Sequence, residues 1–264
     1  MSNSGKNGRI WGHIALSWLA LLAAPAAAQT IPIEPAKVVA RFPHDRQAFT
    51  EGLLWHGGAL YEATGEAGRS SIRKVDLATG KVLQRVDIPP PTFGEGIAIW
   101  KDQIVSLTWK GHVGWRWKLS DFSRIGEFRY PGEGWALTSD GTHLLMSDGT
   151  SQIRVLDPAT MKEVRRIHVT ADGRPLQNIN ELEWVDGEIL ANVWMTNVIA
   201  RIDPATGTVT GWIDLSALTA EVDPRGSDDV PNGIAWDARG KRLFVTGKDW
   251  PTLFQIAWPP KPAG

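Results

Sequence analysis

The segment Thr50-Glu51-Gly52-Leu53-Leu54-Trp55 runs from a polar phrase into an apolar strand, and a second strand follows at residues 60–64 after a Gly-Gly turn. The opening phrase recurs along the chain, and the full set is Glu51-Gly52-Leu53, Glu95-Gly96-Ile97, Glu133-Gly134-Trp135, Glu181-Leu182-Glu183 and Asn232-Gly233-Ile234. The intervals are 44, 38, 48 and 51 residues, and a period of about 45 is typical of four-stranded propeller blades. The sequence therefore predicts an all-β fold, a five-bladed β-propeller.

The radial arrangement of propeller blades brings equivalent positions of successive blades close to one axis. In the repeated phrase these positions carry four acids and one amide: Glu51, Glu95, Glu133, Glu181 and Asn232. Carboxylates held that close together form a binding site, a metal cage or a strongly paired network. We therefore expect the functional site at the axis.

The remaining sequence between the phrases is consistent with an all-β ring. No window of 12 or more residues carries an apolar stripe at helical spacing, so we expect very little helix. Residues 36–42 are expected to pair with residues 253–258 and close the ring, because an open propeller would expose two sheet edges. Residues 219–231 contain two Pro and four acids, which predicts the longest surface loop, at the border of the site.

Residues 1–28 have the pattern of a secretory signal. They lack acids, carry Lys6 and Arg9, run apolar from Ile14 to Ala24 and end in Ala26-Ala27-Ala28. The apolar run is too short to span a bilayer as a stable helix. We therefore predict a signal peptide over residues 1–28, a single propeller domain over residues 29–264, and a periplasmic or secreted protein without a membrane segment after cleavage.

The composition excludes several classes of function. After residue 28 the chain has 26 basic and 29 acidic residues without a basic cluster, which argues against nucleic acid and anionic lipid as partners. With no Cys in the sequence, disulfides, thiolate metal sites and thiol nucleophiles are excluded. The five His residues after residue 28 lack metal-ligand spacing, and no Gly-x-Ser-x-Gly phrase occurs. We therefore predict no metal and no cofactor.

Polar and aromatic residues also gather where the second strands end. The segments are Tyr61-Glu62, Leu107-Thr108-Trp109-Lys110, Ser147-Asp148-Gly149, Asn192-Val193-Trp194 and Thr246-Gly247-Lys248-Asp249-Trp250. These segments would line one mouth of the propeller channel with flat apolar walls and a few directed polar groups. Such a lining is typical of a small-molecule site.

Taken in order, these motifs resemble the plant and bacterial glutaminyl-peptide cyclotransferases over nearly the whole chain after residue 28. The resemblance rests on Phe49-Thr50-Glu51-Gly52-Leu53, Phe93-Gly94-Glu95-Gly96, Leu107-Thr108-Trp109, Glu133-Gly134-Trp135-Ala136-Leu137-Thr138, Ser147-Asp148-Gly149, Asn180-Glu181-Leu182-Glu183, Ala191-Asn192-Val193-Trp194, Asn232-Gly233-Ile234-Ala235 and Thr246-Gly247-Lys248-Asp249-Trp250. It implies a five-bladed propeller that converts N-terminal glutamine of peptides or proteins to pyroglutamate and releases ammonia. It implies no zinc, unlike the unrelated animal enzymes, and we expect a monomer.

The resemblance also implies roles for individual residues. Glu95 is implied as the acid/base carboxylate, and Asn180 and Lys248 as catalytic partners of the reacting amide. Trp109, Trp135 and Trp194 are implied as the aromatic substrate pocket. Position 51, also expected to contact substrate, departs from the family, whose first phrase usually reads Phe-Thr-Gln-Gly-Leu, whereas this chain has Glu51. The departure places an additional ionisable group at the mouth.

The chemistry of ring closure calls for the same residue types. A base must accept a proton from the attacking amine, and an acid must protonate the departing ammonia; one carboxyl of raised pKa performs both steps in turn. Burial beside other acids raises a carboxyl pKa in this way, as expected for Glu95. The oxyanion needs donors, which Lys248 or Asn180 would provide, each worth about 3 kcal/mol.

Each of these residues also has a purely structural interpretation. Glu95 could accept backbone N–H groups at a blade edge, and for Glu51, Glu133, Glu181 and Glu183 a structural role is favoured. Lys248 could form a surface ion pair with its neighbour Asp249. The three Trp residues could be core packing.

Two other functions stay open on the sequence. One is a calcium-dependent lactonase-type propeller, in which clustered Glu, Asn and Asp bind a hard cation. The other is a non-catalytic propeller that binds a protein partner, which predicts an exposed apolar patch on the rim.

Overall fold

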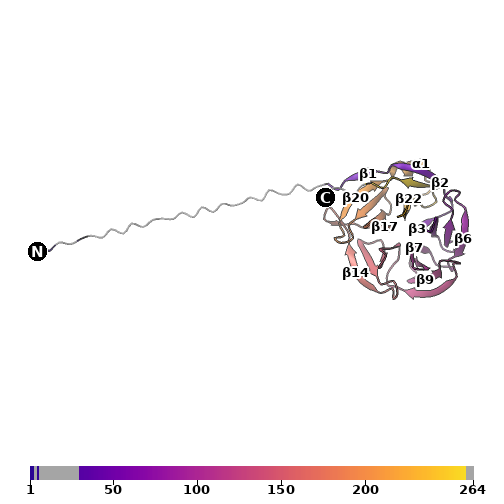
Figure 1. Ribbon diagram of the computed structural model, residues 1–264, viewed down its shortest axis with the longest axis horizontal. Coiled ribbons are helices and arrows are strands. Elements are labelled where there is room, and N and C mark those ends of the chain that lie inside the picture. Colours follow the sequence, from indigo (N-terminus) through magenta and orange to yellow (C-terminus); the bar gives the residue numbers. More distant parts are fainter. Residues whose placement is uncertain (3–4, 6–29, 260–264) are drawn as a thin grey trace.

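The computed structural model describes residues 1–2, 5 and 30–259. The strands form a ring of sheets around a central axis, as Figure 1 shows. This arrangement confirms the predicted all-β, five-bladed propeller. The predicted signal peptide lies almost wholly outside the described residues. Within the described ranges, no helix is long and apolar enough to cross a membrane.

Four blades are built from strands that follow one another in the chain. The first contains β3 (Thr50–His56), β4 (Ala59–Thr64), β5 (Ser71–Val75) and β6 (Val82–Asp87). The second contains β7 (Gly94–Trp100), β8 (Gln103–Thr108), β9 (Val113–Lys118) and β10 (Arg124–Arg129). The third contains β11 (Leu137–Ser139), β12 (Leu144–Met146), β13 (Gln152–Leu156) and β14 (Glu163–His168). The fourth contains β17 (Ile179–Val185), β18 (Glu188–Val193), β19 (Val198–Ile202) and β20 (Val209–Asp214).

The fifth blade joins the two ends of the propeller. It contains β21 (Pro231–Asp237), β22 (Arg242–Gly247), β23 (Thr252–Ile256) and, as its outer strand, β2 (Val38–Pro43). Strand β2 is antiparallel to β23, so the prediction that residues 36–42 pair with the C-terminal strand is correct. The closure leaves neither β2 nor β23 as an open end of the ring.

Four elements lie outside the predicted pattern. Strand β1 (Ile33–Pro35) pairs in parallel with β20 and extends the fourth blade by one strand. Strands β15 (Thr170–Ala171) and β16 (Arg174–Pro175) form a small hairpin. Helix α1 (Ser216–Val222) begins the segment that was predicted as loop over residues 219–231. That prediction is therefore wrong at both ends, because Leu218 and Val222 bury apolar side chains and β21 begins at Pro231.

The inner strands β3, β7, β17 and β21 share an irregularity at the start of each repeated phrase. The register of each ladder shifts there, between Thr50 and Gly52 in β3 and at the matching places in the others. A bulge of this kind re-aims the side chains of the extra residues. The shift brings the following side chains to equivalent axial positions: Glu51, Glu95, Asn180 and Asn232.

The register corrects the expected ring of four acids and one amide. In the fourth blade the axial residue is Asn180, one position before Glu181, because Leu182 pairs where Ile97 and Leu53 pair. In the third blade it is Trp135, whose N–H donates to the carbonyl of Ser147, rather than Glu133. The axial set is therefore two acids, one Trp and two amides, at intervals of 44, 40, 45 and 52 residues.

Glycines allow the inner strands to meet at the axis. A Cβ at Gly52 would lie 3.0 Å from the Cα of Gly96, and one at Gly96 would lie 2.4 Å from the Cα of Ala136. Both contacts are too close for a side chain, so the phrase requires Gly at these positions. The backbones of the first three blades therefore pack directly against one another beneath the axial side chains.

The two acids of the fourth repeated phrase, Glu181 and Glu183, join blades together. Glu181 of the fourth blade accepts hydrogen bonds from the backbone N–H of Leu53 in the first blade (3.2 Å) and of Ile234 in the fifth (3.0 Å). Glu183 accepts from the N–H of Trp236 (2.9 Å) and the hydroxyl of Thr138 (3.0 Å). Their structural interpretation therefore agrees with the contacts observed.

Candidate active site

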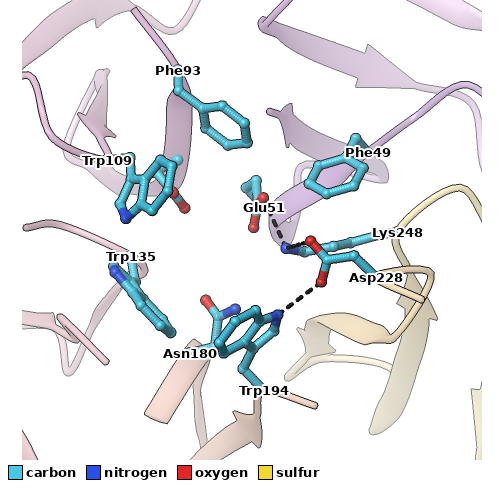
Figure 2. A pocket seen from close by; sticks show the side chains of 10 residues that line it. Phe49, Glu51, Phe93, Trp109, Trp135, Asn180, Trp194, Asp228 and Lys248 are labelled. Atoms are coloured by element: carbon cyan, nitrogen blue, oxygen red, sulfur yellow. Dashed lines mark hydrogen bonds and ion pairs between the residues drawn. The ribbon is translucent and has the colours of Figure 1, made fainter. Parts of the chain in front are cut away.

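Three axial side chains, Glu51, Glu95 and Asn180, form the floor of a pocket of about 190 Å³ at one end of the propeller. Glu51, Glu95 and Asn180 lie in the bulges of three inner strands, and Lys248 is the residue directly after β22. The lining residues are Phe49, Glu51, Phe93, Glu95, Trp109, Trp135, Asn180, Trp194, Asp228 and Lys248, as Figure 2 shows. The structure thus brings all seven predicted site residues into one pocket.

Lys248 is a buried cation with two acidic partners. Its Nζ lies 3.1 Å from Glu51 Oε1, 3.7 Å from Asp228 Oδ2 and 4.4 Å from the ring centre of Phe49. Burial lowers the pKa of Lys248, but the charges of Glu51 and Asp228 outweigh it, and the pKa is raised. Lys248 therefore carries its charge at neutral pH. The alternative of a surface ion pair with Asp249 is wrong, because Lys248 is only 5% exposed and its ion-pair partners are Glu51 and Asp228.

Glu51 is held by two donors that differ in charge. Its Oε1 faces Lys248, and its Oε2 accepts a hydrogen bond from the Nδ2 of Asn232 at 3.0 Å. Burial raises the pKa of Glu51 to about 7, although Lys248 and Asn232 act in the opposite direction. The residue at this position thus titrates near neutrality.

Glu95 is a buried carboxyl without a hydrogen-bond partner in the part of the chain that the structure describes. It is 6% exposed. Burial, followed by the negative charge of Glu51, raises the pKa of Glu95 well above its usual value, and Lys248 opposes the shift. A carboxyl that is buried, raised in pKa and free of hydrogen bonds is suited to exchange protons with a ligand.

Asn180 completes the polar floor. Its Oδ1 is buried and has no hydrogen-bond partner among the residues that the structure describes, while its backbone carbonyl accepts a hydrogen bond from the hydroxyl of Ser147 at 2.8 Å. Buried polar atoms without partners are rare and costly. The hydrogen bond from Ser147 holds the backbone of Asn180. The unpartnered Oδ1 of its side chain is available to accept a hydrogen bond from a ligand.

Aromatic rings form the walls. Phe49 lies edge-on to Phe93 at 6.1 Å between ring centres, and Phe93 lies 5.7 Å from Trp109. Trp135 and Trp194 meet edge to face at 5.7 Å. The indole N–H groups do not point freely into the pocket: each donates to an acid. Trp109 and Trp135 donate to Glu133, and Trp194 donates to Asp228 at 2.8 Å.

Sequence reasoning did not assign three of the lining residues. Phe49 and Phe93 each stand two positions before an axial Glu, and this repeated Phe-x-Glu pattern was a usable signal. Asp228 lies in the segment between α1 and β21, which was expected to border the site. Nothing in its local sequence separates it from the neighbouring acids Asp223 and Asp229.

The comparisons with known proteins agree with this geometry. The sequence profile described as glutamine cyclotransferase matches residues 13–258. The chain belongs to the glutamine cyclotransferase family. A glutaminyl-peptide cyclotransferase of Arabidopsis thaliana is 45% identical over 230 residues, which are 85% of this chain and 71% of the relative.

Solved structures place this family member in the same fold. The glutaminyl cyclase of Myxococcus xanthus superimposes with a TM-score of 0.81 at 34% identity, over 86% of this chain and 97% of that chain. The Cps50 (Swd1) β-propeller domain of Myceliophteria thermophila has a TM-score of 0.50 at 10% identity, over 85% and 100% of the two chains. The second likeness concerns the fold alone.

Proposed function

We propose that this member of the glutamine cyclotransferase family converts N-terminal glutamine of peptides and proteins to pyroglutamate and releases ammonia, with Glu95 as a metal-independent acid/base. The observation that carries the proposal is the carboxyl of Glu95, buried on the floor of the pocket without a hydrogen-bond partner among the described residues. The 45% identity to a glutaminyl-peptide cyclotransferase supports the same reaction.

In the proposed reaction the α-amine nitrogen of the substrate attacks the carbon of its own side-chain carboxamide. A carbon–nitrogen bond forms and gives a tetrahedral intermediate, while ionised Glu95 takes a proton from the amine. The bond to the original amide nitrogen then breaks, and protonated Glu95 returns the proton to the departing ammonia. Because the attack is intramolecular, the pocket has only to hold the side chain folded back on the amine, which the aromatic walls achieve by shape.

The remaining polar floor would stabilise the charge that develops. Lys248 supplies a buried cation for the oxyanion, and one well-placed donor contributes about 3 kcal/mol to such an intermediate. Asn180 has an unpartnered Oδ1 that would accept a hydrogen bond from the substrate amine or carboxamide. Both groups are thus oriented before substrate enters.

The pattern of residues 1–28 supports an exported protein, periplasmic or secreted. Its proposed substrates are peptides or proteins with N-terminal Gln, and its proposed state is a monomer. The polar floor lies within a pocket of about 190 Å³, which fits one terminal residue better than a longer segment of chain. The substrate residues that follow the glutamine would therefore lie outside the pocket.

The direct test is ammonia release by the purified protein from a dipeptide that begins with Gln. The matched control is the Asn dipeptide, because the same attack would require a strained four-membered ring. Ammonia together with a pyroglutamyl product from the Gln dipeptide alone is the expected result. No release from the Gln dipeptide by folded protein would reject the proposed function, and calcium-dependent lactone hydrolysis by the same sample would support the lactonase alternative.

A further inference from the structure

One carboxylate oxygen of Glu133 accepts hydrogen bonds from two indole N–H groups. Its Oε2 lies 2.7 Å from the Nε1 of Trp109 and 2.9 Å from the Nε1 of Trp135. Trp109 follows β8 of the second blade, and Trp135 precedes β11 of the third. The carboxylate therefore joins two adjacent blades through the side chains that form the pocket wall.

The charge of Glu133 strengthens this arrangement. Hydrogen bonds from Trp135 and Trp109 outweigh the effect of partial burial and lower the pKa of Glu133, so the carboxylate is ionised at neutral pH. Hydrogen bonds to an ionised acceptor are roughly twice as strong as neutral ones. The second oxygen, Oε1, lies 3.7 Å from the exposed Nζ of Lys110.

Both indoles also contact other aromatic side chains of the pocket. Trp109 packs against Phe93, and Trp135 packs against Trp194. A displacement of either ring would therefore move its aromatic neighbour as well. The contacts contrast with those of Glu181, whose oxygens accept backbone N–H groups and so brace strands rather than pocket side chains.

We propose that Glu133 is a positioning residue of the cyclisation reaction, which holds the rings of Trp109 and Trp135 in the orientation that folds the substrate side chain onto its amine. This inference rests on the proposed function. Glu133 does not contact the reacting atoms and acts through the two indoles. Displacement of reacting groups by about 1 Å costs up to about 100-fold in rate, so fixed walls matter for turnover.

The test compares two substitutions at Glu133. Glu133→Ala removes the acceptor, and kcat/KM for a Gln dipeptide is expected to fall about ten- to a hundredfold, with KM raised. Glu133→Gln keeps a carbonyl oxygen that accepts both indoles, and at its best pH it should retain activity within about threefold of wild type. Because the charge of Glu133 raises the pKa of Glu95, the Gln variant should also move the acidic limb of kcat/KM to lower pH.

A matched control and a second readout separate this inference from the function on which it depends. Glu127→Ala deletes the same side chain from a surface pair with Arg129 on the outer strand β10, and should behave as wild type. The indole N–H resonances of Trp109 and Trp135 report the hydrogen bonds without any turnover. They should shift and exchange faster with water in the Ala variant but not in the Gln variant.

Each outcome decides the inference. Wild-type KM and kcat in folded Glu133→Ala protein, or an equal loss in both variants, would overturn it. If the Ala variant does not fold, Trp109→Phe/Trp135→Phe removes both donors while Glu133 remains and a phenyl ring replaces each indole, and unchanged kinetics there would overturn it as well. Unchanged resonances in the Ala variant would also overturn it. Shifted indole resonances in a protein whose wild type releases no ammonia would refute the proposed function while leaving the contact intact.

Discussion

Glu95 differs from the buried acids Glu181 and Glu183 in its hydrogen bonding. Glu181 and Glu183 accept hydrogen bonds from neighbouring blades, whereas the carboxyl of Glu95 meets none in the described chain. Glu95→Gln should therefore leave the fold intact and lower turnover about 100-fold or more, since general acid–base catalysis contributes about 10²–10⁴-fold. Ammonia release and near-UV circular dichroism measure the two effects. Near-wild-type release by folded variant would remove Glu95 from the mechanism.

Glu51 gives the second prediction at the scale of a single residue. Its negative charge raises the pKa of Glu95, and the charge of Lys248 lowers the pKa of both carboxyls. Replacing it with neutral Gln should lower the pKa of Glu95, so that the base is ionised at lower pH and the acidic limb of kcat/KM moves in that direction. The pH profile of Glu51→Gln measures the shift. An unchanged limb would show that the two carboxyls do not interact.

At the scale of elements, the segment between α1 and β21 supplies Asp228 to the pocket. Asp228 accepts the indole N–H of Trp194 and lies 3.7 Å from Lys248 Nζ, so it orients one wall and one floor residue together. Asp228→Ala should reduce kcat/KM about tenfold or more, whereas Asp228→Asn, which keeps an acceptor, should lose less. The exposed variant Asp87→Ala is the control. Equal kinetics for Asp228→Ala and wild type would place the segment outside the working site.

The strands show how far the sequence could be interpreted. The period of the repeated phrase predicted the number of blades. The structure explains two of its Gly residues, because close packing at the axis requires Gly52 and Gly96. The phrase alone did not predict which residue reaches the axis. That choice depends on register shifts in the inner ladders, and a shift of one residue exchanges Glu181 for Asn180.

The pocket shows a similar limit. The aromatic and polar lining was predictable because its residues lie in repeated phrases, and the resemblance supplied their roles. Asp228 was not predictable, because a residue in an irregular connection reaches the site only through tertiary packing of α1. The sequence likewise did not predict that one oxygen of Glu133 accepts hydrogen bonds from two indoles, since Trp109 and Glu133 are 24 residues apart in the chain.

For the molecule as a whole, the function should survive removal of metal ions. Within residues 1–2, 5 and 30–259, no group of three or more His, Cys, Asp or Glu is arranged to hold a metal ion. Exhaustive dialysis against a chelator should leave ammonia release within experimental error of the untreated protein. If activity disappears with the fold intact and returns with calcium or zinc, the metal-independent mechanism is wrong.

Strand β1 limits how far the N-terminus of the processed protein can reach. Cleavage after Ala28 would expose Gln29, yet the carbonyl of Pro32 is already bound by the N–H of Trp212 at 2.8 Å. The three residues before that anchor span about 10 Å, whereas β1 lies four strand spacings, about 19 Å, from the inner strand that carries Asn180. While β1 is paired with β20, Gln29 is therefore too far away to enter the pocket of its own molecule.

Cyclisation of Gln29 catalysed by this protein would therefore be a reaction between two molecules. We expect pyroglutamate at Gln29 of the processed protein, with a mass about 17 Da lower and an N-terminus that resists Edman degradation. The rate should rise with protein concentration, and Glu95→Gln protein prepared at the same pace provides the spontaneous background. An unmodified Gln29 in active protein, or equal cyclisation in both proteins, would contradict the expectation. Catalysed cyclisation would then require two copies to meet, so the extent of modification above the spontaneous background depends on the protein concentration after export.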